Sequence, residues 1–151
     1  MKTLLLKIAL IGMLVPYCLP AFAQTQPDEA AKATASYKII LVANIDTEKL
    51  SLTKQEVQNL FMGGVIQIDL TSVAIAAGDP VRTKFNLSII GLTESRVQSY
   101  WAQMQFTGRK KPPITFAKPE HALAYVARNK NTVTYVSTQT SIPPDLVVVY
   151  Q

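Results

Sequence analysis

The feature that most constrains the fold is a regular alternation of short apolar runs with capped helical segments, from residue 37 onwards. Residues 37–43 form a β-branched apolar run that predicts a buried strand. Residues 132–136 and 146–150 predict two further strands, and we expect one or both of 66–70 and 72–76 to be strands. Strands interleaved with helices of about 10–15 residues are typical of an α/β layer fold. We therefore expect one α/β domain over residues 37–151.

Four helix starts separate these runs. Thr53 and Glu56 have the spacing of a capping box, with Leu52 and Val57 as a hydrophobic staple, and Gly63-Gly64 ends that helix. Asp79 precedes a proline at the first position of a second helix that Gly91 closes. The third helix begins after Thr93, and the fourth begins at Pro119. The expected core positions of these last two helices are Val97, Tyr100, Trp101 and Met104, then Ala122, Leu123 and Val126.

The N-terminal residues have the pattern of a signal peptide. Lys2 and Lys7 frame a positive region, an uncharged stretch follows, and Ala21-Phe22-Ala23 before Gln24 is a small-residue cleavage site. We expect residues 1–23 to be a cleavable signal peptide, 24–36 to be a mobile leader, and the mature protein to be periplasmic. An uncleaved anchor is the alternative, and a lipid-modified Cys18 is disfavoured because no small residue precedes it.

Composition excludes several classes of function. One Cys and one His exclude a disulfide framework and a Cys/His zinc site, so we expect no metal and no cofactor. Removing Lys2 and Lys7 leaves 13 basic and 10 acidic residues, a formal charge of +3, which does not describe a nucleic-acid binder. No Ser-His-acid set or carboxylate pair suggests a reaction, so we expect a protein that is not an enzyme. The oligomeric state is open.

Four segments in order resemble a known family. They are Leu50-Ser51-Leu52-Thr53 leading to Leu60-Phe61-Met62-Gly63, Arg82 with Phe85, Tyr100-Trp101 leading to Phe106-Thr107-Gly108 and Pro112-Pro113, and residues 133–137. Together they resemble the periplasmic phosphate-binding proteins of ABC transporters, in the type 2 periplasmic-binding-protein-like superfamily, from about Ile39 to Ser137. The resemblance implies a single compact lobe with a mixed sheet flanked by about four helices. The chain has about half the length of a two-lobed family member, so it supplies about one lobe or two very reduced ones.

The resemblance also implies an anion site at the start of the second helix. Family members hold phosphate with a Ser-Gly-Thr at a helix start, where backbone N–H groups and the helix dipole favour anions. Aligned on Phe85, those positions carry Asp79, Pro80 and Val81, which remove hydroxyls and one N–H donor and add a carboxylate. Arg82 keeps the chemistry of an oxyanion ligand. The candidate ligand-binding residues are Arg82, Thr83, Ser51 and Thr53.

Each candidate also has a structural interpretation. Asp79 and Thr53 are N-caps in this reading, and Arg82 is a first-turn surface residue. Trp101 and Tyr100 fit a core position better than a ligand wall, and Ser95, Arg96 and His121 fit exposed helix positions. Arg109-Lys110-Lys111 is either a solvated loop or a docking site for an acidic partner or lipid surface. The glycosylation pattern at Asn86 lies inside a predicted helix, so we discard it.

Two functions from different classes follow. The first is a substrate-binding-like protein for phosphate or a similar oxyanion, associated with ABC-type transport or sensing. The second is an interaction or accessory protein of an envelope assembly that kept the fold and does not bind a ligand. The adverse residues at 79–81 favour the second, and the family resemblance with the signal peptide favours the first.

Overall fold

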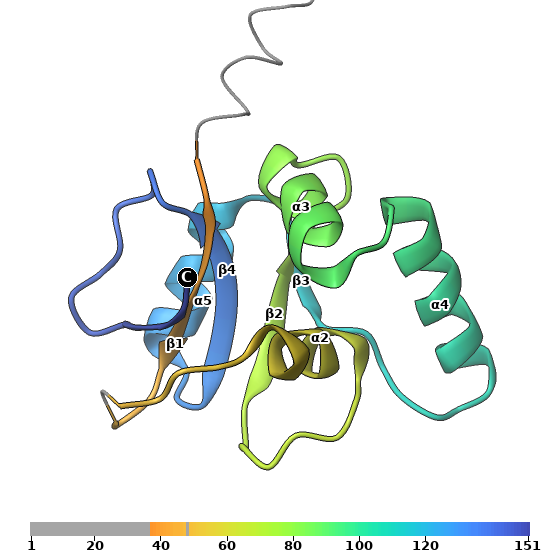
Figure 1. Ribbon diagram of the computed structural model, residues 1–151, viewed down its shortest axis with the longest axis horizontal. Coiled ribbons are helices and arrows are strands. Elements are labelled where there is room, and N and C mark those ends of the chain that lie inside the picture. The colour runs from red at the N-terminus through yellow and green to blue at the C-terminus, as the bar shows by residue number, and fades with distance from the viewer. Residues whose placement is uncertain (1–36, 48) are drawn as a thin grey trace, which may run out of the picture.

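The computed structural model describes residues 37–47 and 49–151, which form an α/β fold around one five-stranded sheet (Figure 1). The predicted signal peptide and leader, residues 1–36, lie outside the described residues and stay predictions. Within the described part of the chain, no helix has the length and apolar character needed to cross a membrane.

The sheet is mixed, as the resemblance implied. Its strands are β1 (Ile39–Asn44), β2 (Thr71–Ile75), β3 (Ile114–Phe116), β4 (Thr132–Ser137) and β5 (Val147–Tyr150), in the order β3-β2-β4-β1-β5. Strand β2 runs parallel to β3 and β4, whereas β1 runs antiparallel to β4 and β5. The carboxyl ends of β2, β3 and β4 therefore lie at one edge of the sheet, where the loops into the following segments gather.

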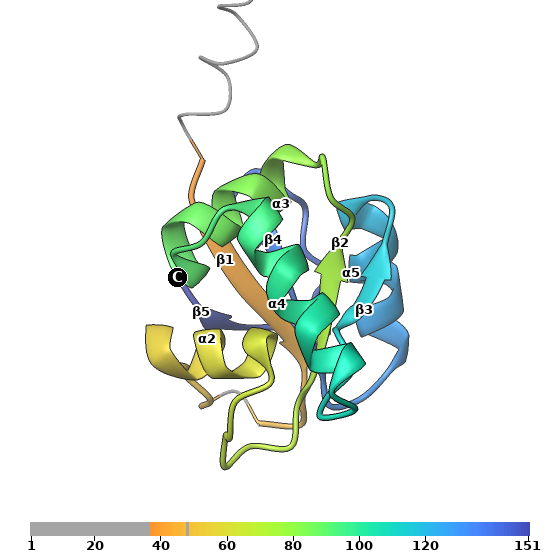
Figure 2. The ribbon, with the colours of Figure 1, turned by 90° about the vertical axis from the view of Figure 1, so that its right-hand side faces the viewer.

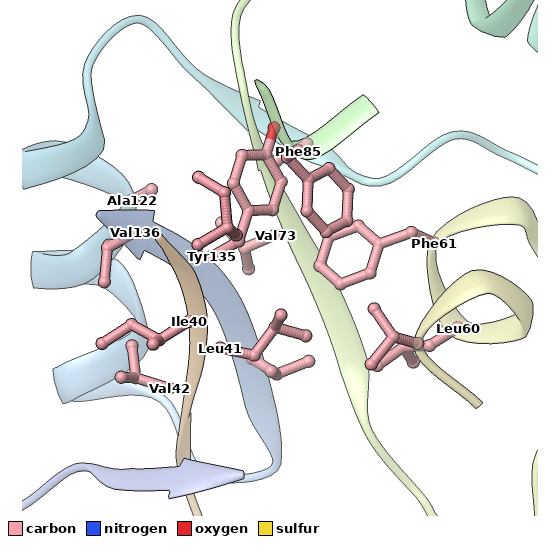
Figure 3. Packing of buried hydrophobic residues seen from close by; sticks show 14 of the residues in the cluster. Ile40, Leu41, Val42, Leu60, Phe61, Val73, Phe85, Ala122, Tyr135 and Val136 are labelled. Atoms are coloured by element: carbon pink, nitrogen blue, oxygen red, sulfur yellow. The ribbon is translucent and has the colours of Figure 1, made fainter. Parts of the chain in front are cut away.

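Helices cover both faces of the sheet, which is why every residue of β1 and β4 is buried. Helix α5 (Pro119–Arg128) packs against β1, β2 and β4 on one face. Helix α2 (Lys54–Met62) and helix α3 (Pro80–Phe85) pack on the other face. Figure 3 shows that successive side chains of these two strands point to opposite faces of the sheet. Ile40 and Val136 point toward α5, while Leu41 and Tyr135 point toward α2. Helix α4 (Glu94–Phe106) lies outermost, beyond α2 and α3 (Figure 2).

The predicted helix boundaries are confirmed at the caps. The hydroxyl oxygen of Thr53 accepts from the Glu56 N–H at 3.3 Å, and the Glu56 carboxylate accepts from the Thr53 N–H at 2.8 Å, which completes the capping box. Gly63 ends α2 with φ +71°, a conformation that glycine adopts without strain. The predicted core residues of α4 are only partly buried: Val97 and Trp101 are buried, and Tyr100 and Met104 are half-buried.

Three details differ from the sequence prediction. Residues 66–70 form a loop, so 72–76 alone supplies the strand in that region (β2). Strand β3 was not predicted, because its three residues are too short to show a period. The helix predicted from Asp79 to Gly91 changes character midway, since α3 continues as the π-helix η1 (Asn86–Ile90) before Gly91 ends it. Within this π turn the Asn86 side chain is buried.

Candidate functional site

The start of α3 is closed by its own cap. The Asp79 carboxylate accepts a hydrogen bond from the Val81 N–H at 2.8 Å, and Pro80 occupies the first helical position. The capping role of Asp79 is therefore confirmed. One first-turn N–H is already used and proline supplies none, so few backbone donors remain there for an anion.

A hollow of about 430 Å³ lies beside this helix start, at the edge where β2, β3 and β4 end. Loops at the carboxyl ends of parallel strands are the usual ligand-binding position of open α/β sheets. The sequence prediction missed most of its polar groups, because they follow β3 and β4 rather than a recognisable motif. The hollow is lined by Tyr37, by Asp79, Pro80 and Val81, by Lys118, Pro119 and Glu120, and by Ser137, Gln139 and Thr140.

Arg82 points away from this hollow, toward α4. Its Nε donates to the Glu94 carboxylate at 2.7 Å, its Nη2 donates to the other carboxylate oxygen at 2.8 Å, and its Nη1 donates to the Ile75 carbonyl at 2.5 Å. The Arg82 and Glu94 side chains are only 13% and 25% exposed. Arg82, the residue predicted to bind an anion, is thus already paired with a carboxylate of the same chain.

Two further side chains complete this cluster around Glu94. The Asn86 amide donates at 2.7 Å and the Gln98 amide at 3.0 Å to the same carboxylate. Arg82 and Asn86 also line a cavity of about 50 Å³ between α4 and the sheet, whose remaining walls are largely apolar and include Phe61, Phe85 and Trp101. The donors around Glu94 are therefore one guanidinium and two amides, and its carboxylate accepts from all three side chains.

Hydrogen bonds set the acidity of Glu94. Burial on its own would raise the pKa of this carboxyl, but hydrogen bonds from Arg82 and Gln98, the Arg82 charge and the Asn86 hydrogen bond together hold it below the ordinary value of 4.5. A carboxyl whose pKa is lowered by folding stabilises the fold fully above its unfolded pKa, and this contribution is lost as the pH falls through the folded pKa.

The lowered pKa of Glu94 gives a prediction for acid unfolding. We expect the free energy of unfolding to fall as the pH drops below about 4.5, and Glu94→Gln to make that fall shallower while lowering stability at neutral pH. Urea unfolding from neutral to acidic pH measures both effects. Asp145→Asn removes an exposed carboxylate and is the matched control for the loss of one charge, and it should change stability at neutral pH by no more than about 0.5 kcal/mol. The same slope in wild type and Glu94→Gln would contradict the prediction.

The other predicted ligand residues do not join Arg82. Thr83 is exposed, and its hydroxyl donates to the Asp79 carbonyl at 3.1 Å. The hydroxyl of Thr53 donates to Glu56 at 2.7 Å within the capping box, and Ser51 is exposed. Neither Ser51 nor Thr53 lines the hollow or the cavity described above. Their roles as ligands stay predictions.

The structural interpretations of the remaining candidates fit what the structure describes. Trp101 is buried, while Ser95, Arg96 and His121 are exposed on the first turns of α4 and α5. Arg109, Lys110 and Lys111 lie exposed in the loop between α4 and β3. Asn86 is 3% exposed and bonded to Glu94, which agrees with discarding the glycosylation pattern.

No protein-family model matches the sequence, and no curated protein matches it. The solved structures that share its fold include the following three. An ABC-type phosphate transport receptor from Vibrio cholerae matches with a TM-score of 0.55 and 13% identity, over 76% of this chain and 46% of that one. A phosphate ABC transporter substrate-binding protein with bound phosphate from Clostridium perfringens matches with a TM-score of 0.55 and 15% identity, over 75% of this chain and 44% of that one. PstS from Borrelia burgdorferi matches with a TM-score of 0.54 and 10% identity, over 76% of this chain and 47% of that one.

These matches concern the backbone. The chain spans less than half the length of each of the three solved structures. The family resemblance read from the sequence is thus confirmed at the level of the fold, and the described chain has the α/β fold of a lobe of the phosphate-binding transport proteins.

Proposed function

We propose that the chain is a periplasmic substrate-binding-like protein for phosphate or a similar oxyanion, which binds rather than converts its ligand and works with an ABC-type transporter or sensor. The observation that carries this proposal is the fold, since two of the solved structures named above are phosphate transport proteins and one of these two holds bound phosphate. The signal-peptide pattern of residues 1–23 supports the periplasmic location.

The anion in this proposal takes the place of the Glu94 carboxylate on Arg82. The guanidinium fork and the Asn86 amide are donors of the kind that hold a tetrahedral oxyanion. Glu94 competes with such a ligand, so wild-type affinity is lower than the donors alone would give. Asp79 does not line this cavity.

A phosphate titration of wild type and four variants tests the proposal. We expect Arg82→Ala to bind phosphate about 10- to 100-fold more weakly than wild type, because a charge-assisted hydrogen bond contributes about 1.5–3 kcal/mol. Glu94→Gln should bind more tightly, because no carboxylate then competes for Arg82. Lys118→Ala, which removes a cation from the separate hollow, should bind as wild type does. Arg82→Lys keeps the charge and checks that lost binding is not lost folding.

The remaining outcomes are equally informative. Loss of phosphate binding in Lys118→Ala alone would move the site to the hollow and refute the role of Arg82. A thermal-shift panel with phosphate, sulfate, arsenate and carboxylates extends the test to other anions, because a ligand at 100 times its Kd adds about 2.7 kcal/mol of stability. No response in wild type or in Glu94→Gln would refute the binding function.

A second candidate function has its own observation. Arg82 is bonded to Glu94 and Ile75, and Asp79 with Pro80 closes the start of α3, so both predicted features of an anion site have structural roles. This favours an accessory protein of an envelope assembly that uses the fold as a surface. A flat anion panel is the result that would select this function.

A further inference from the structure

The two most exposed large apolar side chains of the described residues lie at the same end of the molecule. Phe106 is 93% exposed at the end of α4, and Val65 is 87% exposed in the loop between α2 and β2. Both views of the ribbon place this loop and this end of α4 at the lower end, opposite α3 (Figures 1 and 2). Leaving both side chains in water forgoes the apolar burial that normally stabilises such groups.

We refer to Phe106 and Val65 as the apolar tips. A basic loop, residues Arg109–Lys111, joins them into one surface. The Lys110 ammonium donates to the Gly63 carbonyl, two residues from Val65. The hydroxyl of Tyr100 on α4 donates to the Met62 carbonyl at 2.6 Å, which ties α4 to the end of α2. The basic loop also lines an open hollow together with Gln105, near Phe106 in the chain.

The charges of the basic loop are not neutralised within the described part of the chain. Its three residues are consecutive and exposed, and none of them belongs to either ion pair found there, Arg82–Glu94 and Lys130–Asp46. Three adjacent cations attract a polyanionic surface far more than isolated ones do.

We propose that this end of the protein docks on an anionic phospholipid bilayer, with the basic loop at the headgroups and Phe106 and Val65 inserted between them. Cations next to apolar tips are the combination that binds the bilayer interface, where charge attraction and apolar burial add. The apolar tips sit on two separate segments and stand out almost completely, which suits insertion between headgroups. The core of a protein interface would instead need one continuous apolar patch.

Docking in this way gives the protein an orientation. The start of α3 and the carboxyl ends of β2, β3 and β4 lie at the opposite end of the fold (Figure 1). The hollow there would face away from the bilayer and stay open to solutes. The proposal concerns a different surface from the Arg82 cluster and does not depend on phosphate binding.

Vesicle co-sedimentation tests the proposal with the chain from Gln24 onwards, which contains the whole described fold. We expect about a hundred-fold tighter binding to phosphatidylglycerol than to phosphatidylcholine vesicles, because each of three cations contributes about fivefold at an anionic surface. The double variant Arg109→Ser with Lys111→Ser should weaken that binding about 30-fold, because it removes two cations that each contribute about fivefold. Both substitutions leave the Lys110 contact intact. Raising the salt to about 1 M should abolish it.

Matched variants separate this surface from general charge and hydrophobicity. Lys38→Ser with Arg96→Ser removes one lysine and one arginine elsewhere and should bind vesicles as wild type does. Phe106→Ser should weaken binding about tenfold, whereas Leu87→Ser, at another exposed apolar position, should not. Circular dichroism confirms that each variant is folded.

Three results would overturn the proposal. They are the absence of binding to phosphatidylglycerol vesicles, equal binding to both lipids, and wild-type binding by the Arg109/Lys111 double variant. If the protein binds poly-glutamate but no vesicle, and the double variant loses that binding, then the partner is an acidic polypeptide and the lipid proposal is wrong.

Discussion

Replacing Phe85 with alanine is expected to destabilise the fold by about 3–5 kcal/mol, which is the usual cost of removing a fully buried phenyl ring. The Phe85 ring is 2% exposed and stacks on Tyr135 with centroids 3.8 Å apart and planes at 3°. It also meets Phe61 edge-on at 4.9 Å, so one ring joins α2, α3 and β4 (Figure 3). The cluster extends to β2, because the Ile75 N–H donates to the Tyr135 hydroxyl at 3.1 Å.

Urea unfolding measures this loss, and Leu87→Ala is the matched control two residues further along the same helical segment. Leu87 is 57% exposed, so its truncation should change stability by no more than about 0.5 kcal/mol. If Phe85→Ala is too unstable to fold, Phe85→Leu keeps most of the volume and allows a measurement. Equal stability of the Phe85 and Leu87 variants would show that the aromatic cluster is not central to the core.

The fold was predictable because local signals and periodicity agree along most of the chain. The capping box at Thr53, the proline after Asp79 and the glycine at 91 each lie at a helix end, and each acts through a few neighbouring residues. Strand β3 and the loop at 66–70 were not predictable in the same way. Three residues show no period, and an alternating pattern in a loop looks like a strand until its neighbours are known.

The site was less predictable, because it depends on contacts between distant segments. The sequence identifies Arg82 as the cation of the region, but its partner Glu94 lies 12 residues away and no local pattern pairs the two. Lys118 and Ser137 join Asp79 only because the ends of β2, β3 and β4 meet at one edge of the sheet. Such groupings follow from strand order, which the sequence did not determine.

The pairing of Arg82 with Glu94 is the second feature for which we expect a large effect on stability. Arg82→Met should cost about 3 kcal/mol, because it leaves a partly buried carboxylate without its cation and removes the hydrogen bond to the Ile75 carbonyl. Glu94→Leu alone should cost a similar amount, because it leaves the guanidinium unpaired. The double variant removes both charges, so it should cost about 1–3 kcal/mol less than the sum of the two single changes.

A double-mutant cycle by urea unfolding decides whether this coupling exists, and additive single costs would contradict it. The coupling energy between Arg82 and Glu94 also determines the expected result of the phosphate titration. An anion that replaces Glu94 must offset the hydrogen bonds that Arg82, Asn86 and Gln98 already make to that carboxylate. A large coupling energy therefore predicts weak phosphate binding in wild type and a large gain in Glu94→Gln, whereas a small one predicts similar affinities. Measured together, the two energies show whether Glu94 is a competitor that phosphate can displace or a permanent partner of Arg82.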